Sequence, residues 1–255
     1  MSTVPTDSRT PELDGAPLFL VDEVSESEEL LVGGAEGRHA VNVLRLVAGE
    51  RVRVGDGRGV VAEGEVLHAG HEGLRVRVHA RLQVPAPGLE LVLVQALPKG
   101  ERGPLAVELA TELGVDRIIP WAAARCVTRW RDDRVAKGLA KWRSAARAAS
   151  KQSRRPRVPE VVDVMTTRQV CGALAEVDVA LVLHEQARHP LAEVEVPATG
   201  SVAVVVGPEG GLTDGEVVAL AAAGARPVRL GPEVLRTSTA GAAALAALSV
   251  RTRWS

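Results

Sequence analysis

The fold is decided by residues 202–240, which read VAVVVGPEGGLTDGEVVALAAAGARPVRLGPEVLRTSTA. The apolar run 202–206 is typical of a strand buried on both faces of a sheet, and it leads directly into a Gly-Pro-Glu-Gly-Gly loop at 207–211. Thr213 and Glu216 follow with the Thr-x-x-Glu spacing of a capping box, which predicts that a helix begins there. This half of the stretch therefore predicts one unit of strand, loop and helix.

The second half of the stretch repeats the same order of elements. A short strand at 227–230 leads into a second Gly-Pro-Glu tripeptide, and an Ala- and Leu-rich run predicts a final helix over 239–250. That helix is apolar on every side, which is typical of a buried or interface helix. Two successive units of this kind predict a parallel α/β sheet. Ligands bind such sheets at the carboxyl ends of the strands, where both loops lie.

The same alternation of elements extends upstream to about residue 89. Buried strands are predicted at 89–97, 117–120 and 179–183, and helices at 104–113 and 132–152. The nucleotide-binding patterns G-x-G-x-x-G and G-x-x-x-x-G-K-[ST] are absent, as is the nucleophile motif G-x-S-x-G. These absences disfavour a nicotinamide enzyme, a P-loop NTPase and an α/β-hydrolase.

The N-terminal part of the chain has a different period. Alternating apolar and charged residues, as in 51–54 and 74–78, predict several short strands that suggest a small β barrel or sandwich. The Pro-rich sequence QVPAPG that follows breaks any regular element. We therefore expect a flexible tail at 1–16, a β-barrel domain at 17–84 and the α/β domain at 85–255.

The composition is that of an ordinary globular protein of 255 residues, with 46% apolar and 25% charged residues and a net charge of −1. Cys126 and Cys171 form no close pair and no Cys/His cluster, which disfavours a disulfide framework and a metal site. No run is long enough for a membrane-spanning helix, and the N-terminus lacks the pattern of a signal peptide. We expect a cytoplasmic protein with neither a metal nor a membrane partner.

The net charge hides an uneven distribution of charged residues. Thirteen basic and only two acidic residues lie between Arg117 and Arg157, and this excess of +11 leaves −12 for the rest of the chain. Such an excess, without compensating acids, indicates a surface for a polyanion such as RNA. The alternative is a merely solvated helix face. Within this segment Trp142 is expected in the core, and Trp130 is a weak candidate for stacking on a base.

These stretches together resemble one known family. The matching motifs are VVGPEGGLTDGEV (205–217), LGPEVLRTSTAGAAALAAL (230–248), Lys99-Gly100-Glu101-Arg102, Thr111-Glu112-Leu113-Gly114-Val115, Gln152-Ser153-x-Arg155 and His39-x-x-x-x-Leu44-Arg45. They are similar to the RsmE-type family, whose members methylate N3 of a uridine in small-subunit ribosomal RNA. The resemblance implies a PUA-like β-barrel followed by a SPOUT-class α/β domain with a C-terminal trefoil knot. It also implies a homodimer and S-adenosylmethionine as the methyl donor.

Two positions depart from the family's pattern. Ser238 stands where the family often has Glu, and Lys151 stands where a Glu often precedes the residue that aligns with Gln152. Neither missing glutamate can be given a catalytic task in this protein. Lys151 instead adds to the basic surface.

The resemblance implies which residues hold the donor. They lie at the end of the strand 179–183, in the first Gly-Pro-Glu loop, and from the second such loop into the last helix. The expected donor-binding residues are Leu183, His184, Glu185, Val206, Gly207, Pro208, Glu209, Gly210, Gly211, Leu230, Gly231, Val234, Leu235, Thr237, Thr239 and Ala240.

Arg236 is the main catalytic candidate, because a cation at this place would stabilise the charge left on uracil as N3 loses its proton. Its alternative is an arginine at a helix start that pairs with Glu209 or Glu233. His184 and Glu209 are candidates for the general base, and each could instead be a structural hydrogen-bonding group.

We expect RNA contacts from both parts of the chain, with 16S ribosomal RNA in the small subunit as the partner. The expected RNA-binding residues are His39, Arg45, Lys99, Arg102, Arg125, Arg129, Lys137, Lys141, Lys151, Gln152, Arg154 and Arg155. For His39 a place in the barrel core is the alternative.

Two other functions stay open. A non-catalytic RNA-binding or ribosome-assembly protein could use the same barrel and basic helix, and binding of S-adenosylmethionine would separate it from an enzyme. A related SPOUT enzyme could methylate another RNA position, because the donor loops are shared. A small-molecule α/β enzyme is disfavoured by the +11 segment.

Overall fold

The computed structural model describes residues 15–254 and divides them into two compact units. The first unit comprises residues 15–86 together with Arg154–Arg157, and the second comprises residues 87–153 and 158–254. Of the predicted N-terminal tail, all but residues 15 and 16 lie outside the described part of the chain. Within that part, no helix has both the length and the apolar character that crossing a membrane requires.

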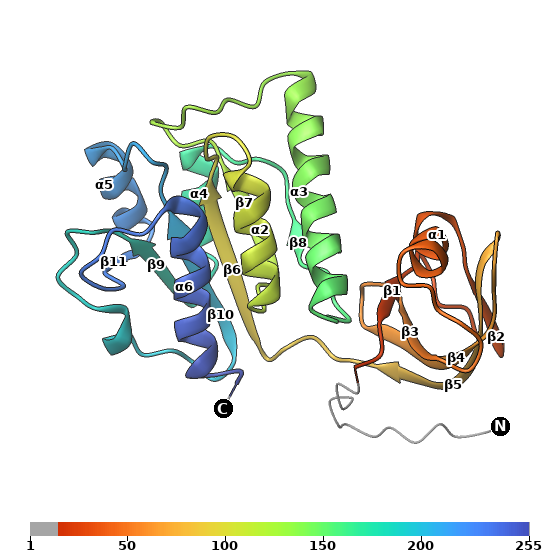
Figure 1. The fold of residues 1–255 in the computed structure, drawn as a ribbon. Coiled ribbons are helices and arrows are strands. Elements are labelled where there is room, and N and C mark those ends of the chain that lie inside the picture. The colour runs from red at the N-terminus through yellow and green to blue at the C-terminus, as the bar shows by residue number, and fades with distance from the viewer. Residues whose placement is uncertain (1–14, 255) are drawn as a thin grey trace. The chain divides into compact units, whose positions relative to one another are not determined.

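The first unit is built on one five-stranded sheet (Figure 1). Its strands lie in the order β1 (Leu18–Leu20), β3 (Arg51–Gly55), β4 (Val60–Gly70), β5 (Gly73–Gln83) and β2 (Glu29–Val32). β1 and β3 are parallel, whereas the other neighbours are antiparallel. Val32, Val66 and Leu74 are completely buried in its core, as the alternating pattern predicts.

This unit also contains a helix, α1 (Gly34–Asn42), which the sequence pattern does not predict. The sequence does not predict it because it contains Gly34 and Gly37, and glycine is a poor helix former. A Cβ atom on Gly37 would lie 2.3 Å from the carbonyl oxygen of Val32, so glycine is needed for the helix to approach the strand this closely. The strand pattern over 17–84 thus leaves this helix out.

The short segment Arg154–Arg157 belongs to the first unit through the side chain of Arg157. Its guanidinium donates to the carbonyl oxygen of Val84 from Nε (3.1 Å) and from Nη2 (2.7 Å). Arg157 also forms an isolated β-bridge with Arg58. Gly59 has a φ of 114°, and a Cβ atom there would lie 2.5 Å from Nη2 of Arg157.

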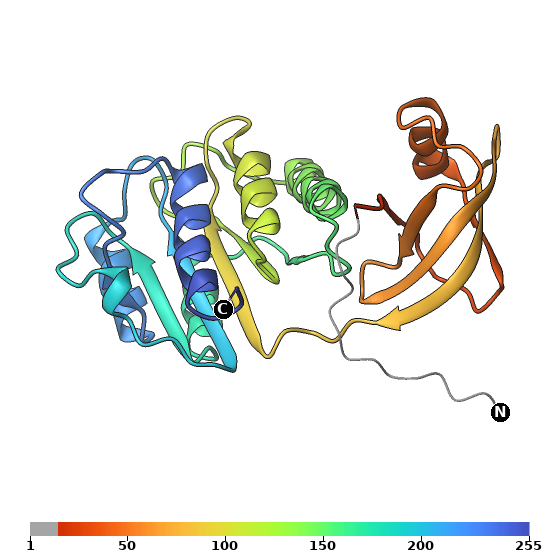
Figure 2. The same cartoon turned by 60° about the horizontal axis from the view of Figure 1, so that its bottom comes forward.

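The second unit is a three-layer α/β/α domain around six parallel strands. The sheet order is β11 (Arg226–Val228), β9 (Val179–Leu183), β10 (Gly200–Val206), β6 (Leu89–Ala96), β7 (Arg117–Trp121) and β8 (Glu160–Val161). One face is covered by α2 (Arg102–Glu112), α3 (Asp133–Gln152) and α6 (Thr237–Val250), and the other by α4 (Thr167–Leu174) and α5 (Asp214–Ala222) (Figures 1 and 2). A short 3₁₀ helix, η1 (Leu191–Glu193), follows β9.

Helix α6 is buried within its own domain, where it packs against β6, β10 and α2. Ala244, Leu245 and Leu248 are completely buried, and a Cβ atom on Gly241 would lie 2.9 Å from Cδ1 of Leu93. Burial inside the chain, one of the two explanations for the apolar character of this helix, is therefore confirmed. The helix begins at Thr237, two residues before its predicted start.

Candidate active site

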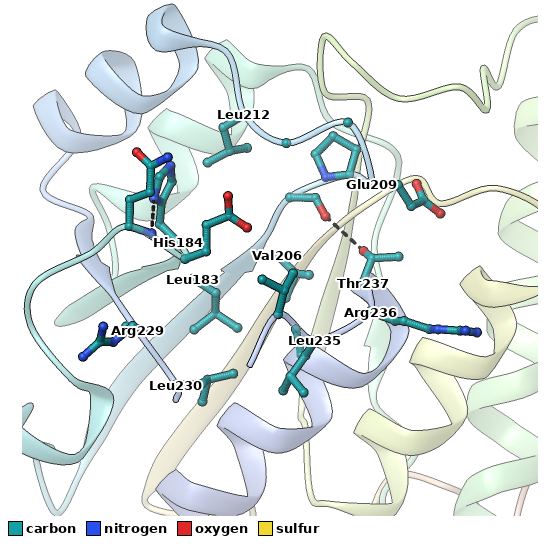
Figure 3. A pocket seen from close by; sticks show the side chains of 18 of the residues that line it. Leu183, His184, Val206, Glu209, Leu212, Arg229, Leu230, Leu235, Arg236 and Thr237 are labelled. Carbon is teal, nitrogen blue, oxygen red and sulfur yellow. Dashed lines mark hydrogen bonds between the residues drawn. The ribbon is translucent and has the colours of Figure 1, made fainter. Parts of the chain in front are cut away.

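The predicted donor-binding residues surround one cavity of about 660 Å³ in the second unit. The cavity lies at the carboxyl ends of β9, β10 and β11, where the loops after these strands meet the first turn of α6 (Figure 3). Leu183, Val206, Leu230 and Leu235 supply apolar walls. This is the position at which open parallel sheets bind ligands.

Every predicted donor-binding residue except Thr239 lines this cavity. Thr239 is exposed on the first turn of α6. Thr237 and Ala240, three residues apart, share the face of the helix that lines the cavity, and the helical period turns Thr239 away from it. Thr239 is thus the one predicted donor-binding residue that does not line the cavity.

The sequence did not single out several other residues that line the cavity. They are Gln186, Leu212, Asp214, Arg229 and Glu233, and they are joined by Arg102 and Arg125, which were expected at the RNA. Each of the first five lies within three residues of a predicted donor-binding residue. Proximity along the chain was therefore the signal that could have found them.

The glycines of the first loop stand where a side chain would be crowded or strained. A Cβ atom on Gly207 would lie 3.0 Å from Cδ2 of Leu212, and one on Gly210 would lie 3.2 Å from Cβ of Arg125. Gly211 has a φ of 71°, which is in the left-handed region that favours glycine. The loop thus presents backbone groups, rather than side chains, to a ligand in the cavity.

A chain of buried hydrogen bonds joins the two Gly-Pro-Glu loops. Gln95, completely buried at the end of β6, donates from Nε2 to Oγ1 of Thr237 (2.9 Å). The Thr237 hydroxyl donates in turn to the carbonyl oxygen of Gly207 (3.0 Å; Figure 3). Gly207 opens the first loop and Thr237 ends the second, so this chain holds both loops in one relative position.

The cavity is lined by equal numbers of acidic and basic side chains. They are Glu185, Glu209, Asp214 and Glu233 on the one hand, and Arg102, Arg125, Arg229 and Arg236 on the other. This mixture fits S-adenosylmethionine, which carries a sulfonium, an ammonium and a carboxylate, while the apolar walls suit its flat adenine ring. Within residues 15–254, no three His, Cys, Asp or Glu side chains are grouped so that they could hold a metal ion.

The three catalytic candidates lie on different sides of the cavity. Arg236 and Glu209 extend to the same side of the view in Figure 3, whereas His184 lies on the opposite side. Nδ1 of His184 accepts a hydrogen bond from the backbone N–H of Gln186 (3.2 Å). That nitrogen is therefore already engaged in holding the loop after β9.

Glu209 accepts hydrogen bonds from Lys99 and Arg102 and not from Arg236. Its Oε1 accepts from the backbone N–H of Lys99 (3.1 Å) and from Nη1 of Arg102 (3.3 Å). Arg236 is the exposed N-cap residue of α6, and its guanidinium makes no hydrogen bond or ion pair with any residue in the described part of the chain. The alternative pairing of Arg236 with Glu209 or Glu233 is therefore not formed.

The basic segment is partly neutralised by acids that lie outside it in the sequence. The ion pairs are Arg117–Glu90 (2.6 Å), Lys141–Glu101 (2.5 Å) and Arg143–Asp163 (3.3 Å). The expectation that this segment lacks compensating acids is wrong for these three cations. Arg134 and Lys137 remain exposed on α3, with no ion pair to any residue that the structure describes.

Two of the expected RNA-binding residues also donate hydrogen bonds to loops of their own domain, and their contact with RNA stays a prediction. Nη1 of Arg125 donates to the carbonyl oxygens of Gly210 (3.2 Å) and Leu212 (3.1 Å). Arg129 donates to the carbonyl oxygens of residues 123–124. The guanidinium of Arg125 therefore shapes the rim of the cavity, which is a role that local sequence does not reveal.

The remaining expected RNA-binding residues are divided between the two units. His39, Arg45, Arg154 and Arg155 lie in the first unit, and Lys99, Lys137, Lys151 and Gln152 lie in the second. His39 is exposed, so its alternative place in the barrel core is wrong.

Trp130 takes part in packing rather than standing free for a base. Its ring is half-buried and meets Trp142 edge-on, with centroids 5.3 Å apart and an interplanar angle of 79°. A Cβ atom on Gly138 would lie 2.4 Å from the Trp130 ring, so the glycine admits the indole against α3. Trp142 is buried in the core, as predicted.

Comparison with known proteins agrees with this architecture. A family model described as an RNA methyltransferase domain matches residues 85–249, and one described as an RNA methyltransferase PUA domain matches residues 32–78. The ribosomal RNA small subunit methyltransferase E of Mycobacterium tuberculosis is 47% identical over 94% of this chain and 94% of its own length. The chain belongs to the ribosomal RNA small subunit methyltransferase E family. The predicted PUA-like domain and SPOUT-class α/β domain are thereby confirmed.

Other members of the methyltransferase E family are similar over comparable lengths. The Bacillus subtilis protein of that name is 30% identical over 90% of this chain and 93% of its own. A crystal structure of the Neisseria gonorrhoeae methyltransferase E, bound to S-adenosylmethionine, has a TM-score of 0.82 and 28% identity. It covers 93% of this chain and 98% of its own.

Proposed function

We propose that the protein transfers the methyl group of S-adenosylmethionine to N3 of one uridine in 16S ribosomal RNA of the small subunit. The observation that carries the proposal is the cavity where the two Gly-Pro-Glu loops meet, with its glycine-lined wall and balanced charges. The names of the relatives support the RNA substrate, and the donor bound to the Neisseria gonorrhoeae relative supports the donor.

The bound donor would supply an electrophilic methyl group on a positively charged sulfur. The residues of the chain hold that donor and keep the acceptor in line with it, and such orientation can supply much of the rate. Backbone groups of the loops 207–211 and 230–235 suit the first task. The chain Gln95–Thr237–Gly207 keeps these loops in register.

Arg236 and Glu209 are assigned to the acceptor. As the N3–H bond of uracil breaks and the N3–methyl bond forms, negative charge gathers on the ring oxygens, and the unpaired guanidinium of Arg236 would stabilise it. Glu209 is the better candidate than His184 to receive the proton. It lies on the side of Arg236, and its Oε2 accepts no hydrogen bond from any described residue, whereas Nδ1 of His184 is engaged.

We assign RNA binding to the domain 17–84 and to the exposed cations of α3, and catalysis to the domain 85–255. The match of residues 32–78 to a PUA domain of RNA methyltransferases supports the first assignment. Arg134 and Lys137 support the second surface, because cations without protein partners are the ones that can neutralise phosphates.

We also propose a homodimer, a C-terminal trefoil knot and a cytoplasmic location. The resemblance to the methyltransferase E family supports the homodimer. The resemblance to the SPOUT class supports the knot. A substrate in the small ribosomal subunit supports the location.

The proposal is tested with purified protein, unmodified small ribosomal subunits and isotopically labelled S-adenosylmethionine. Mass spectrometry of the digested 16S RNA should detect one 3-methyluridine, and a strain that lacks the gene should lose it. Methylation of a different position would favour a related SPOUT activity. A protein that binds RNA but no donor would favour the non-catalytic alternative.

A further inference from the structure

Glu216, the third residue of α5, is buried among hydrogen-bond donors from three parts of the second unit. Its side chain is 5% exposed. Oε2 accepts from the backbone N–H and the hydroxyl of Thr213 (both 2.9 Å), which forms the capping box of α5. Oε1 accepts from the backbone N–H of Ala124 (2.8 Å) and from the hydroxyl of Thr167 (3.4 Å). One carboxylate thus joins the start of α5, the segment after β7 and the start of α4.

The segment after β7 in turn holds the first Gly-Pro-Glu loop. Ala124 is followed by Arg125, whose guanidinium donates to the carbonyl oxygens of Gly210 and Leu212. The loop is therefore fixed at its far end by Glu216 through Thr213, and along its length by Arg125. Glu216 itself does not line the donor cavity.

We infer that Glu216 is a positioning residue for the donor loop, acting through Thr213 and Ala124. This inference rests on the proposed function, since it assumes that the loop 207–211 holds the methyl donor. The carboxylate keeps the loop 207–211 in its binding conformation before the donor arrives. Less conformational entropy is therefore lost when the donor binds.

The site requires a carboxylate, because two of the four groups that donate to it are backbone N–H groups, which cannot act as acceptors. The backbone N–H groups of Thr213 and Ala124 face different oxygens of Glu216, and a backbone N–H can only donate. The amide of Glu216→Gln has the same shape, but it offers one oxygen and one NH₂ group. Whichever way it turns, it loses one of the two backbone hydrogen bonds.

The test compares Glu216→Gln with Gln169→Ala. Gln169 completes a second capping box, with Thr166 at the start of α4, and lies outside the cavity, so its removal costs a similar helix cap. We expect the dissociation constant of S-adenosylmethionine, measured by calorimetry, to rise about tenfold in Glu216→Gln and to stay within twofold in Gln169→Ala. At saturating donor the turnover number of Glu216→Gln should stay within about twofold of wild type.

The outcomes separate the inference from the proposed function. A wild-type dissociation constant in Glu216→Gln, or a lower turnover number at an unchanged constant, would mean that Glu216 only stabilises the fold. Wild-type protein that bound no donor would overturn the proposed function and the inference with it. If Glu216→Gln does not fold, Thr213→Val tests the same link from the other end, because it removes the hydroxyl that donates to Oε2 of Glu216 at a residue outside the cavity. An unchanged donor affinity in that variant would contradict the inference.

Discussion

The guanidinium of Arg236 stands at the junction of a loop and a helix and has no partner among the residues that the structure describes. We expect Arg236→Ala to lower the turnover number at least about 100-fold, because the charge on the uracil would lose its stabilising cation. The dissociation constant of S-adenosylmethionine should stay within about twofold. Single-turnover methylation and calorimetry measure the two quantities. Arg226→Ala, an exposed arginine on β11 outside the cavity, is the control, and unchanged turnover in Arg236→Ala would contradict the assignment.

At the level of single residues, the sequence predicted those parts of the site whose residues are neighbours along the chain. The two Gly-Pro-Glu loops and the end of β9 mark most of the cavity wall, since neighbouring residues of a loop line the same space. Gln95 could not be found in this way, because its partner Thr237 lies 142 residues away. Likewise, the positive charge of Arg125 predicts an RNA contact. Its hydrogen bonds to the carbonyl oxygens of the first loop could not be predicted, because the fold alone brings these residues together.

The first turn of α6 offers a matched pair of threonines for a prediction. Thr237→Val would break both hydrogen bonds that join Gln95 to Gly207, while Thr239→Val changes an exposed residue of the same turn. We expect the first variant to lose about 1–3 kcal/mol of unfolding free energy, because Nε2 of the buried Gln95 keeps only the carbonyl oxygen of Ala96 as an acceptor and the carbonyl oxygen of Gly207 loses its donor. This variant should also bind the donor more weakly. The second should lose less than about 0.5 kcal/mol. Urea denaturation and calorimetry measure these effects, and equal losses would refute the linking role.

Glu216 at the start of α5 should make the stability of the protein depend on pH in the acidic range. Burial acts to raise the pKa of Glu216, but the hydrogen bonds from Thr213, Ala124 and Thr167 outweigh it and lower the pKa below its usual value of 4.5. A lowered pKa contributes stability that is complete above the unfolded-state value and is lost as the pH falls through the folded-state value. The stability advantage of wild type over Glu216→Gln should therefore be constant near neutrality and shrink below about pH 4.5. Urea midpoints from pH 7 to 3 test this, and a constant difference would contradict it.

At the level of elements, periodicity was the dependable signal. The alternation of buried runs and amphipathic stretches predicted most strands and helices of the second unit to within a few residues, but it missed β8 and α4. The capping box predicted the start of α5 correctly. Helix α1 was missed as well, because Gly37 is required by a close approach to Val32 and Gly73 that exists only in the folded unit, and Gly34 has a φ of 60°.

The whole molecule carries a charge distribution that has a measurable consequence. Arg134 and Lys137 are exposed on α3, on one face of the sheet, whereas Arg168 on α4 and Arg226 on β11 are exposed elsewhere. Changing the first pair to glutamine should flatten the dependence of log K for 16S RNA on log salt by about 1.5, because two phosphate contacts are lost. Changing the second pair should leave that slope unaltered. Titrations at several salt concentrations measure it, and equal slopes for both double variants would remove α3 from the RNA surface.

The chain passes between its two units more than once, because Arg154–Arg157 folds with residues 15–86 although it follows α3. The first unit is thus not a simple N-terminal appendage. A chimera that exchanges only residues 15–86 with a relative would leave the guanidinium that donates to the carbonyl oxygen of Val84 behind in the host chain. Recombination within this family can therefore exchange the first unit intact only when the gene segments for residues 15–86 and 154–157 are exchanged together.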